Sequence, residues 1–225
     1  CILHLESGFD GDLLVNGQPV DTSRVDLIPR DSDHLEAVNQ IIENGESFLN
    51  EKYIPSGWSG IASNLTFSGG ENQDVVCFDS PEGLEDPVRI FASKKQGFEK
   101  WVEAGNTRQQ GGGFHKVVTA AANGGYLGFG NLFTAEPKET FTQSYIAFRC
   151  DSEEEAHNLC AYLKTDFVEF FLSMRKASKN ISRVTIKWIP LPDLTREWTN
   201  EMLKSENPFD LTQEALDIIY KSSEG

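Results

Sequence analysis

The sequence lacks several features, and each absence excludes a class of protein. It contains no run of about eighteen apolar residues, so we expect no helix that spans a membrane. Its first residues have no basic stretch and include Glu6, Asp10 and Asp12, which is unlike a secretory signal peptide. Hydrophobic residues make up 39% of the chain and aromatic residues 11%, which is too much apolar material for a disordered protein.

Cysteine and histidine are also scarce. The cysteines are widely spaced and form no C-x-x-C pair, so a zinc site is not expected; they are Cys1, Cys77, Cys150 and Cys160. Scattered cysteines in a chain of this length fit a reducing cytosol, and we therefore expect a cytoplasmic protein. No two histidines have the spacing of metal ligands on a helix, and no metal-binding residue is predicted.

Basic residues are rare in the first part of the chain. The net charge is −15, and residues 1–88 hold 3 basic and 17 acidic side chains. Residues 89–187 hold 14 basic and 10 acidic side chains, whereas residues 188–225 hold 3 and 8. The middle of the chain is therefore positive between two negative ends, and a polyanionic partner is compatible with that middle region although the whole chain is acidic.

Two stretches of the middle region contain no acidic residue, namely 104–135 and 170–192. A polyanion that approaches them meets no fixed negative charge. The alternative interpretation is that charges segregate around helix ends, because acids are favoured at the positive end of a helix and bases at the negative end. Both interpretations are open at the level of sequence.

The most regular pattern predicts a long amphipathic helix from about residue 152 to 176. Apolar residues recur there at steps of three and four, and Ser152 with Glu155 has the spacing of a capping box. Shorter helices are predicted at 35–50, 98–104, 195–204 and directly after Thr212.

Runs of β-forming residues bounded by turn residues predict strands at 74–78, 88–92, 141–150 and 184–189. Together with the helices they indicate an α/β or α+β fold. We expect a mixed β-sheet, the long helix (about 152–176) packed on it, and short C-terminal helices. No internal repeat or low-complexity linker divides the chain, so residues 1–225 are expected to form a single domain.

Four segments of the second half stand in an order that resembles a known family. They are Thr134–Pro137 with Thr142–Ile146, Cys150–Ala156 with Tyr162–Thr165, Trp188–Leu194 with Glu197–Thr199, and Leu211–Ala215. Their order and spacing resemble the C-terminal target-recognition (specificity) region of N6-adenine DNA methyltransferases from bacterial restriction–modification systems. The resemblance covers most of residues 1–15 and 88–221.

The resemblance implies sequence-specific recognition of duplex DNA, which positions a target adenine for S-adenosylmethionine-dependent N6 methylation. The family's catalytic tetrapeptide, Asn/Asp/Ser-Pro-Pro followed by an aromatic residue, is absent, and so is its Phe-x-Gly-x-Gly cofactor loop. We therefore expect no catalytic or cofactor-binding residue in this chain. The family implies that the chain is a fragment, and that its partners are duplex DNA, an upstream catalytic domain that binds S-adenosylmethionine, and a restriction subunit.

Two sets of polar residues in the acid-free stretches are candidates for DNA contacts. Side chains that can pair with base edges are Asn106, Arg108, Gln109, Gln110, His115 and Lys116. Candidates for phosphate contacts are Arg175, Lys176, Lys179, Arg183 and Lys187, with hydrogen bonds added by Ser178 and Asn180. The alternative is an ordinary polar loop for the first set and solvated helix or loop ends for the second.

Two other functions remain open from sequence. A protein–protein interaction domain would use the basic region to bind an acidic subunit, and a metal-dependent nuclease would hold Mg²⁺ beside a phosphate. The acidic residues of 1–88 need a separate explanation, because 17 acids cannot line a DNA groove without strong repulsion. Our hypothesis is that they face away from DNA or dock against the catalytic domain or a partner subunit.

Overall fold

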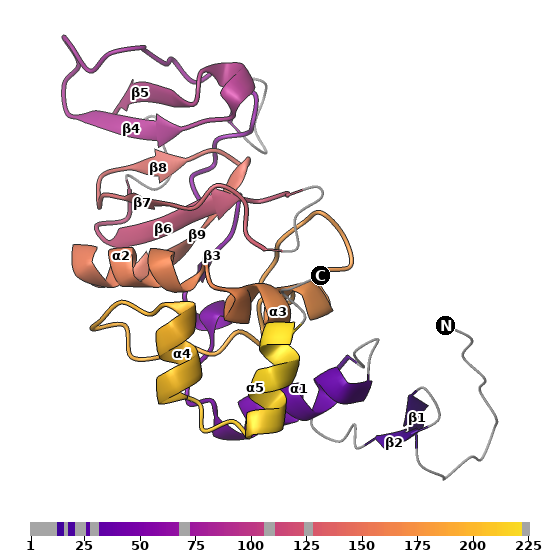
Figure 1. Cartoon of the computed structure of the whole chain (residues 1–225). Helices are drawn as coiled ribbons and strands as arrows, with labels where there is room; N and C mark the ends of the chain where they lie inside the picture. Colours follow the sequence, from indigo (N-terminus) through magenta and orange to yellow (C-terminus); the bar gives the residue numbers. More distant parts are fainter. Residues whose placement is uncertain are drawn as a thin grey trace.

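Strands and helices occupy separate layers of the molecule (Figure 1). The computed structural model describes residues 13–15, 18–20, 26–27, 32–67, 73–105, 111–123 and 128–221. A three-stranded sheet and a four-stranded sheet form the upper part in the view, and helices α1 to α5 gather below them. This segregation of helices from mostly antiparallel strands makes the fold α+β, as predicted.

The four-stranded sheet is antiparallel and lies at the centre. Its strand order is β3 (Tyr53–Ile54), β9 (Tyr145–Cys150), β6 (His115–Ala120) and β7 (Phe133–Ala135). Alternate residues of β9 face two different cores, since Ile146 and Phe148 pack toward the helices while Tyr145 and Ala147 pack toward the other sheet. Burial on both faces explains the continuous apolar run in the sequence.

The three-stranded sheet is mixed. Strand β4 (Pro87–Phe91) pairs antiparallel with β5 (Glu99–Glu103) and parallel with β8 (Thr140–Phe141). The predicted helix at 98–104 is therefore wrong: this segment is strand β5, because Val102 packs with Val88 in a small core of this sheet. Strands β1 (Leu13–Val15) and β2 (Gln18–Val20) form a separate two-stranded ribbon.

The long helix predicted at 152–176 is broken into two helices. They are α2 (Glu153–Tyr162) and α3 (Asp166–Arg175). Thr165 stops continuous helix formation because its hydroxyl caps α3, accepting a hydrogen bond from the Val168 amide (3.4 Å). The apolar spacing continues across the break because both helices contribute to one core. The predicted cap at Ser152 is confirmed, with the Glu155 amide 3.0 Å from its hydroxyl.

Three further helices complete the lower layer, α1 (Ser32–Asn44), α4 (Asn200–Glu206) and α5 (Gln213–Lys221). The predicted cap at Thr212 is confirmed by a hydrogen bond from the Ala215 amide to its hydroxyl (3.3 Å). Short 3₁₀ helices occur at η1 (Leu49–Glu51) and η2 (Lys94–Gln96). Among the described residues, no helix combines the length and apolar character needed to cross a membrane.

The strand predicted at 184–189 is a series of turns instead. The Lys187 amide bonds back to the Val184 carbonyl (3.3 Å), and the Ile189 amide bonds back to that of Ile186 (3.2 Å). These local bonds replace strand pairing and turn Trp188 into the helix-side core, where it is buried. Hydrophobic β-forming residues were therefore a signal of burial at this position and not of a strand.

A buried lysine joins the two sheets. Lys116 on β6 is fully buried, and its Nζ donates to the carbonyl oxygens of Glu136 (2.7 Å) and Glu139 (3.0 Å). The Glu139 carboxylate accepts hydrogen bonds from Nε of Arg89 on β4 (2.6 Å) and from the Glu136 amide (2.7 Å). The turn between β7 and β8 is thus bonded to both sheets, which holds them in one relative position.

Burial has the largest effect on the pKa of Lys116. Loss of hydration lowers its pKa from 10.5 to about 8, and the negative charges of Glu139 and then Glu136 oppose that decrease. In the window between these two values, the unfolded chain keeps a proton that the folded chain has released. The contribution of Lys116 to the free energy of unfolding therefore rises as the pH rises from about 8 to about 10.5.

The substitution Lys116→Met should lower the free energy of unfolding by about 2 kcal/mol at pH 7, because two buried carbonyls lose their donor. The difference in the free energy of unfolding between wild type and variant should then increase, by at most about 3 kcal/mol, as the pH is raised to about 10.5. Denaturant unfolding of both proteins at several pH values measures this difference. Cysteine and tyrosine titrations are shared by the two proteins and cancel, so a constant or shrinking difference would contradict the assignment.

Candidate nucleic-acid interface

The two acid-free stretches of the sequence meet in the structure. The segment that follows β6 runs beside the segment that follows α3, with the Asn123 amide bonded to the Lys179 carbonyl (2.7 Å) and the Ile181 amide to that of Ala121 (2.9 Å). Ala122 and Asn180 form an isolated antiparallel bridge between the same segments. Two segments that are far apart in the chain and contain no acidic residue thus lie side by side on one surface.

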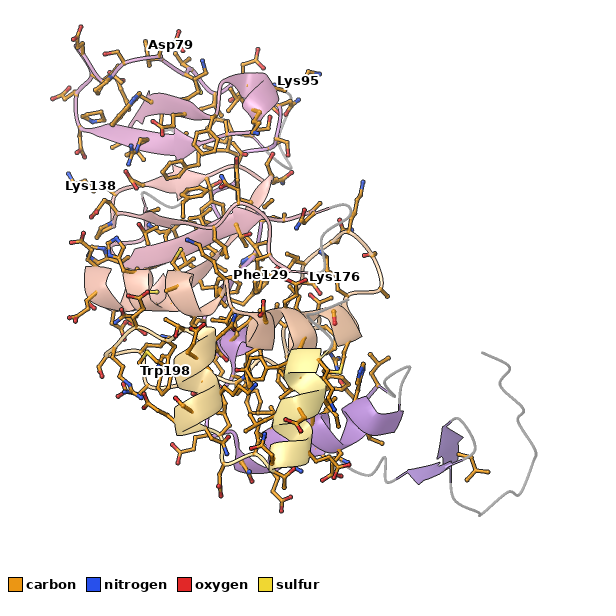
Figure 2. The ribbon with its side chains drawn as sticks, in the orientation of Figure 1. Asp79, Lys95, Phe129, Lys138, Lys176 and Trp198 are labelled. Carbon is orange, nitrogen blue, oxygen red and sulfur yellow. The ribbon has the colours of Figure 1, made fainter. Side chains whose placement is uncertain are left out.

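The glycine-rich segment contacts this surface as well. The Gly128 carbonyl accepts hydrogen bonds from Nδ2 of Asn123 (3.3 Å) and from Nζ of Lys176 (3.4 Å). Figure 2 shows Lys176 beside Phe129, on the side of the molecule opposite Lys138. Burial lowers the pKa of Lys176, and the charge of nearby Glu169 opposes that decrease.

We call residues 176–183 the basic ridge. Four of the predicted phosphate-contacting residues are exposed along it, namely Ser178, Lys179, Asn180 and Arg183, whereas Lys176 is half-buried. Arg183 donates from Nε to the Asn50 carbonyl (2.9 Å), which tethers the far end of the ridge to η1. The ridge therefore presents cationic and hydroxyl or amide groups together, which is the combination that phosphate contacts use.

Arg175 does not belong to this exposed set, and its predicted role in phosphate binding is wrong. Its side chain is only 4% exposed. The guanidinium stacks over the Trp188 ring at 4.3 Å, donates to the Val184 carbonyl (2.8 Å) and pairs with both carboxylate oxygens of Asp26 (2.6 and 3.1 Å). A phosphate cannot reach a guanidinium whose donors already serve the core.

Asp26 was not singled out in the sequence, although it belongs to the acidic first part of the chain. Its carboxylate also pairs with Lys187 (3.0 Å), another predicted phosphate contact. Arg175 first, and then Lys187, lower the pKa of Asp26 to about 2, so Asp26 is ionised at neutral pH. Here the acidic part docks onto the basic region and partly neutralises it; Lys187 remains about half exposed.

His115 and Lys116 lie at the other end of β6 from the basic ridge. Along the strand, Lys116 is five residues from Ala121, a separation of roughly 17 Å, and His115 is one residue further away. His115 is half-buried, with its Nδ1 3.8 Å from the Glu136 carboxylate. Lys116 is fully buried, as described above, so the prediction that it reads base edges is wrong. A buried ammonium bonded to two carbonyls has no access to a groove.

The other candidates for base reading, Asn106, Arg108, Gln109 and Gln110, lie outside the described residues. Three glycines that follow them belong to the described residues. Gly111, Gly112 and Gly113 all have a positive φ, of 73°, 80° and 71°. Gly111 is buried so closely against the β7–β8 turn that an added Cβ would lie 2.1 Å from the Pro137 carbonyl oxygen. Only glycine fits here, and it anchors the end of the candidate base-reading loop to the joint between the sheets.

Two hollows on the surface are large enough for a small ligand. One of about 410 Å³ lies between residues 128–132 and the turn from α2 to α3, where Lys164 and Glu169 line it. The other, of about 380 Å³, is lined among others by Lys52, Arg149 and Asp151. Both mix positive and negative side chains, so neither is selective for an anion.

The described residues also show no site for a metal ion, since no three His, Cys, Asp or Glu side chains cluster among them. Glu136-Pro137-Lys138 has the Glu-x-Lys spacing found in metal-dependent nucleases, a signal that the sequence reading missed. In the structure this string falls in the β7–β8 turn and serves the joint between the sheets. Comparison with protein-family models and with curated protein sequences found no match.

Substituting Gly111 by alanine should lower the free energy of unfolding by disturbing the contact between Gly111 and the β7–β8 turn. The change Gly111→Ala adds both left-handed strain and a clash with Pro137, whereas Gly113→Ala has the same sign of φ and open space around the new Cβ. We expect Gly113→Ala to cost about 1 kcal/mol and Gly111→Ala at least about 2 kcal/mol more. Thermal and denaturant unfolding measure both values; equal costs would show that the turn yields without penalty.

Proposed function

We propose that this chain binds duplex DNA through the basic ridge, as the target-recognition region of an adenine-specific DNA methyltransferase of a restriction–modification system. One observation carries the DNA-binding part: the two acid-free stretches are hydrogen-bonded to each other and form one surface. The methyltransferase part rests on the resemblance of the second half of the chain to that family. Three described cysteines with free thiols, Cys77, Cys150 and Cys160, suit the cytoplasmic location that goes with this function.

Charge is distributed so that DNA has one preferred side of approach. Exposed acids of the helical layer include Glu36 and Glu43 on α1, Glu201 on α4 and Glu214 on α5, and a second group, which includes Asp79 and Glu85, precedes β4. The basic ridge follows the C-terminal end of α3, beside the end of the four-stranded sheet. A duplex seated on the ridge keeps its phosphates away from most of these acids, which supports the hypothesis that the acidic groups face away from DNA.

The described residues Gly128 and Gly130 do not fit a site for S-adenosylmethionine. Gly128 and Gly130 form a glycine-rich segment, but strand β7 follows them and no helix does, whereas a nucleotide-binding glycine loop opens a helix. Methyl transfer is therefore assigned to a separate catalytic domain. In that arrangement this chain binds and orients the duplex, and the catalytic domain takes the adenine out of the base stack.

The double substitution Lys179→Ala and Arg183→Ala should weaken binding to every duplex sequence. It removes two exposed cations of the basic ridge, so the slope of log K against log salt should fall by about 2. Fluorescence anisotropy with labelled duplexes at several salt concentrations measures the slope. The control is Lys138→Ala with Lys204→Ala, which removes the same charge from exposed positions on the β7–β8 turn and on α4, away from the ridge (Figures 1 and 2), and should leave the slope nearly unchanged.

The same measurement separates the rival function. Poly-glutamate, used at the same ionic strength, represents an acidic protein partner. Binding of poly-glutamate as tight as that of duplex DNA would favour a protein–protein interaction surface. Identical salt slopes for the ridge variant, the control variant and wild type would remove the basic ridge as the DNA contact.

A further inference from the structure

A second cationic group lies at the tip of the β4–β5 hairpin. Lys94 and Lys95 of η2 are both exposed, and no ion-pair partner for either ammonium exists within the described part of the chain. The sequence around them, residues 87–98, contains no acidic residue. This third acid-free stretch is short, and the sequence reading did not single it out.

The tip is held rigidly by its own backbone, which keeps the two lysines in one place. The amides of Gly97 and Phe98 bond to the carbonyls of Lys94 (3.1 Å) and Ser93 (3.1 Å), and the Ala92 amide bonds to the Phe98 carbonyl (2.6 Å). Gly97 adopts a φ of 91°, which closes the 3₁₀ turn. Binding an anion at this tip would therefore require little ordering of the backbone.

Aromatic contacts fix this tip to the central sheet. Phe133 on β7 packs edge-on against Phe91 (4.7 Å between ring centroids) and Phe98 (5.8 Å). The Tyr145 hydroxyl donates to the Ala92 carbonyl (2.9 Å), so the hairpin tip touches the first residue of β9. Edge-to-face aromatic contacts and a buried hydrogen bond make this attachment stiff.

The attachment point is at the same end of the central sheet as the basic ridge. Tyr145 pairs with Ala120, the last residue of β6, and the Ala121 amide bonds to the Ser144 carbonyl (2.9 Å). Ala121 is also the residue that accepts the hydrogen bond from Ile181 of the ridge. Figure 2 shows Lys95 and Lys176 on the same side of the molecule, with Lys138 on the other.

We infer that Lys94 and Lys95 form a second phosphate-contact point, and that one DNA duplex lies across this end of the central sheet, touching both the hairpin tip and the basic ridge. The inference rests on the proposed function and adds to it a second element of the fold. Duplex DNA fits this pair of contacts because its negative charge repeats along the axis, so two cationic points on a rigid frame engage one ligand together. Tyr145, Ser144 and Ala121 link the two contact points through hydrogen bonds.

The test uses the full chain and the double substitution Lys94→Ala with Lys95→Ala. Both side chains are exposed and unpaired, so the variant should keep the wild-type unfolding midpoint. With a long labelled duplex we expect affinity to fall on the order of tenfold and the salt slope to fall by about 2. The conservative variant Lys94→Arg with Lys95→Arg should bind as wild type does. The charge-matched control, Lys138→Ala with Lys204→Ala, should change the affinity by no more than about twofold and leave the salt slope unchanged.

Each outcome separates the two proposals. A hairpin variant that behaves like the charge-matched control, while Lys179→Ala with Arg183→Ala weakens binding, overturns the second contact point and leaves the proposed function in place. A hairpin variant that weakens binding when the ridge variant does not would support the hairpin contact and overturn the ridge. Absence of duplex binding by the wild-type chain at low salt would overturn both.

Discussion

The relative position of the two sheets depends on one buried ammonium group. Lys116 gives its hydrogen bonds to the main chain of the β7–β8 turn, and the carboxylate of Glu139 in that turn takes those of Arg89 from the other sheet. Burying a charge is costly unless acceptors surround it, and here two main-chain carbonyls accept hydrogen bonds from the ammonium. The same turn receives the backbone of Gly111, so the candidate base-reading loop is anchored where the sheets are joined.

This joint gives a mechanical frame to the surface that we propose for DNA. The hairpin tip with Lys94 and Lys95 belongs to one sheet, and the strand end that carries the basic ridge belongs to the other. Aromatic packing around Phe133 and the Tyr145 hydrogen bond connect them at one end, while Lys116 connects them at the opposite end. Two points of attachment hold the cationic groups in place without DNA, which lowers the ordering cost of binding.

The proposed DNA surface depends on the absence of acidic side chains as much as on the presence of basic ones. The chain has a net charge of −15, yet parts of three acid-free stretches come together at one end of the central sheet. Two acids nevertheless lie in this region: Glu169 is near Lys176, and Asp26 enters from the acidic part of the chain and is paired there with Arg175 and Lys187. A strongly acidic protein can thus keep a surface for a polyanion, provided that its acids are confined to other elements.

The sequence by itself determined the local features of this protein: the mixture of helices and strands, the caps at Ser152 and Thr212, the apolar pattern of the helices and the stretches without acid. These depend on neighbours a few residues apart, or on composition alone. Only the tertiary structure decided the break at Thr165, the turns around Trp188, and which basic residues stay exposed. Arg175 and Lys179 carry the same charge in the same stretch, but Arg175 is buried against the Trp188 ring and Lys179 faces solvent. Burial is decided by contacts between distant segments, and a one-dimensional pattern of charges does not contain them.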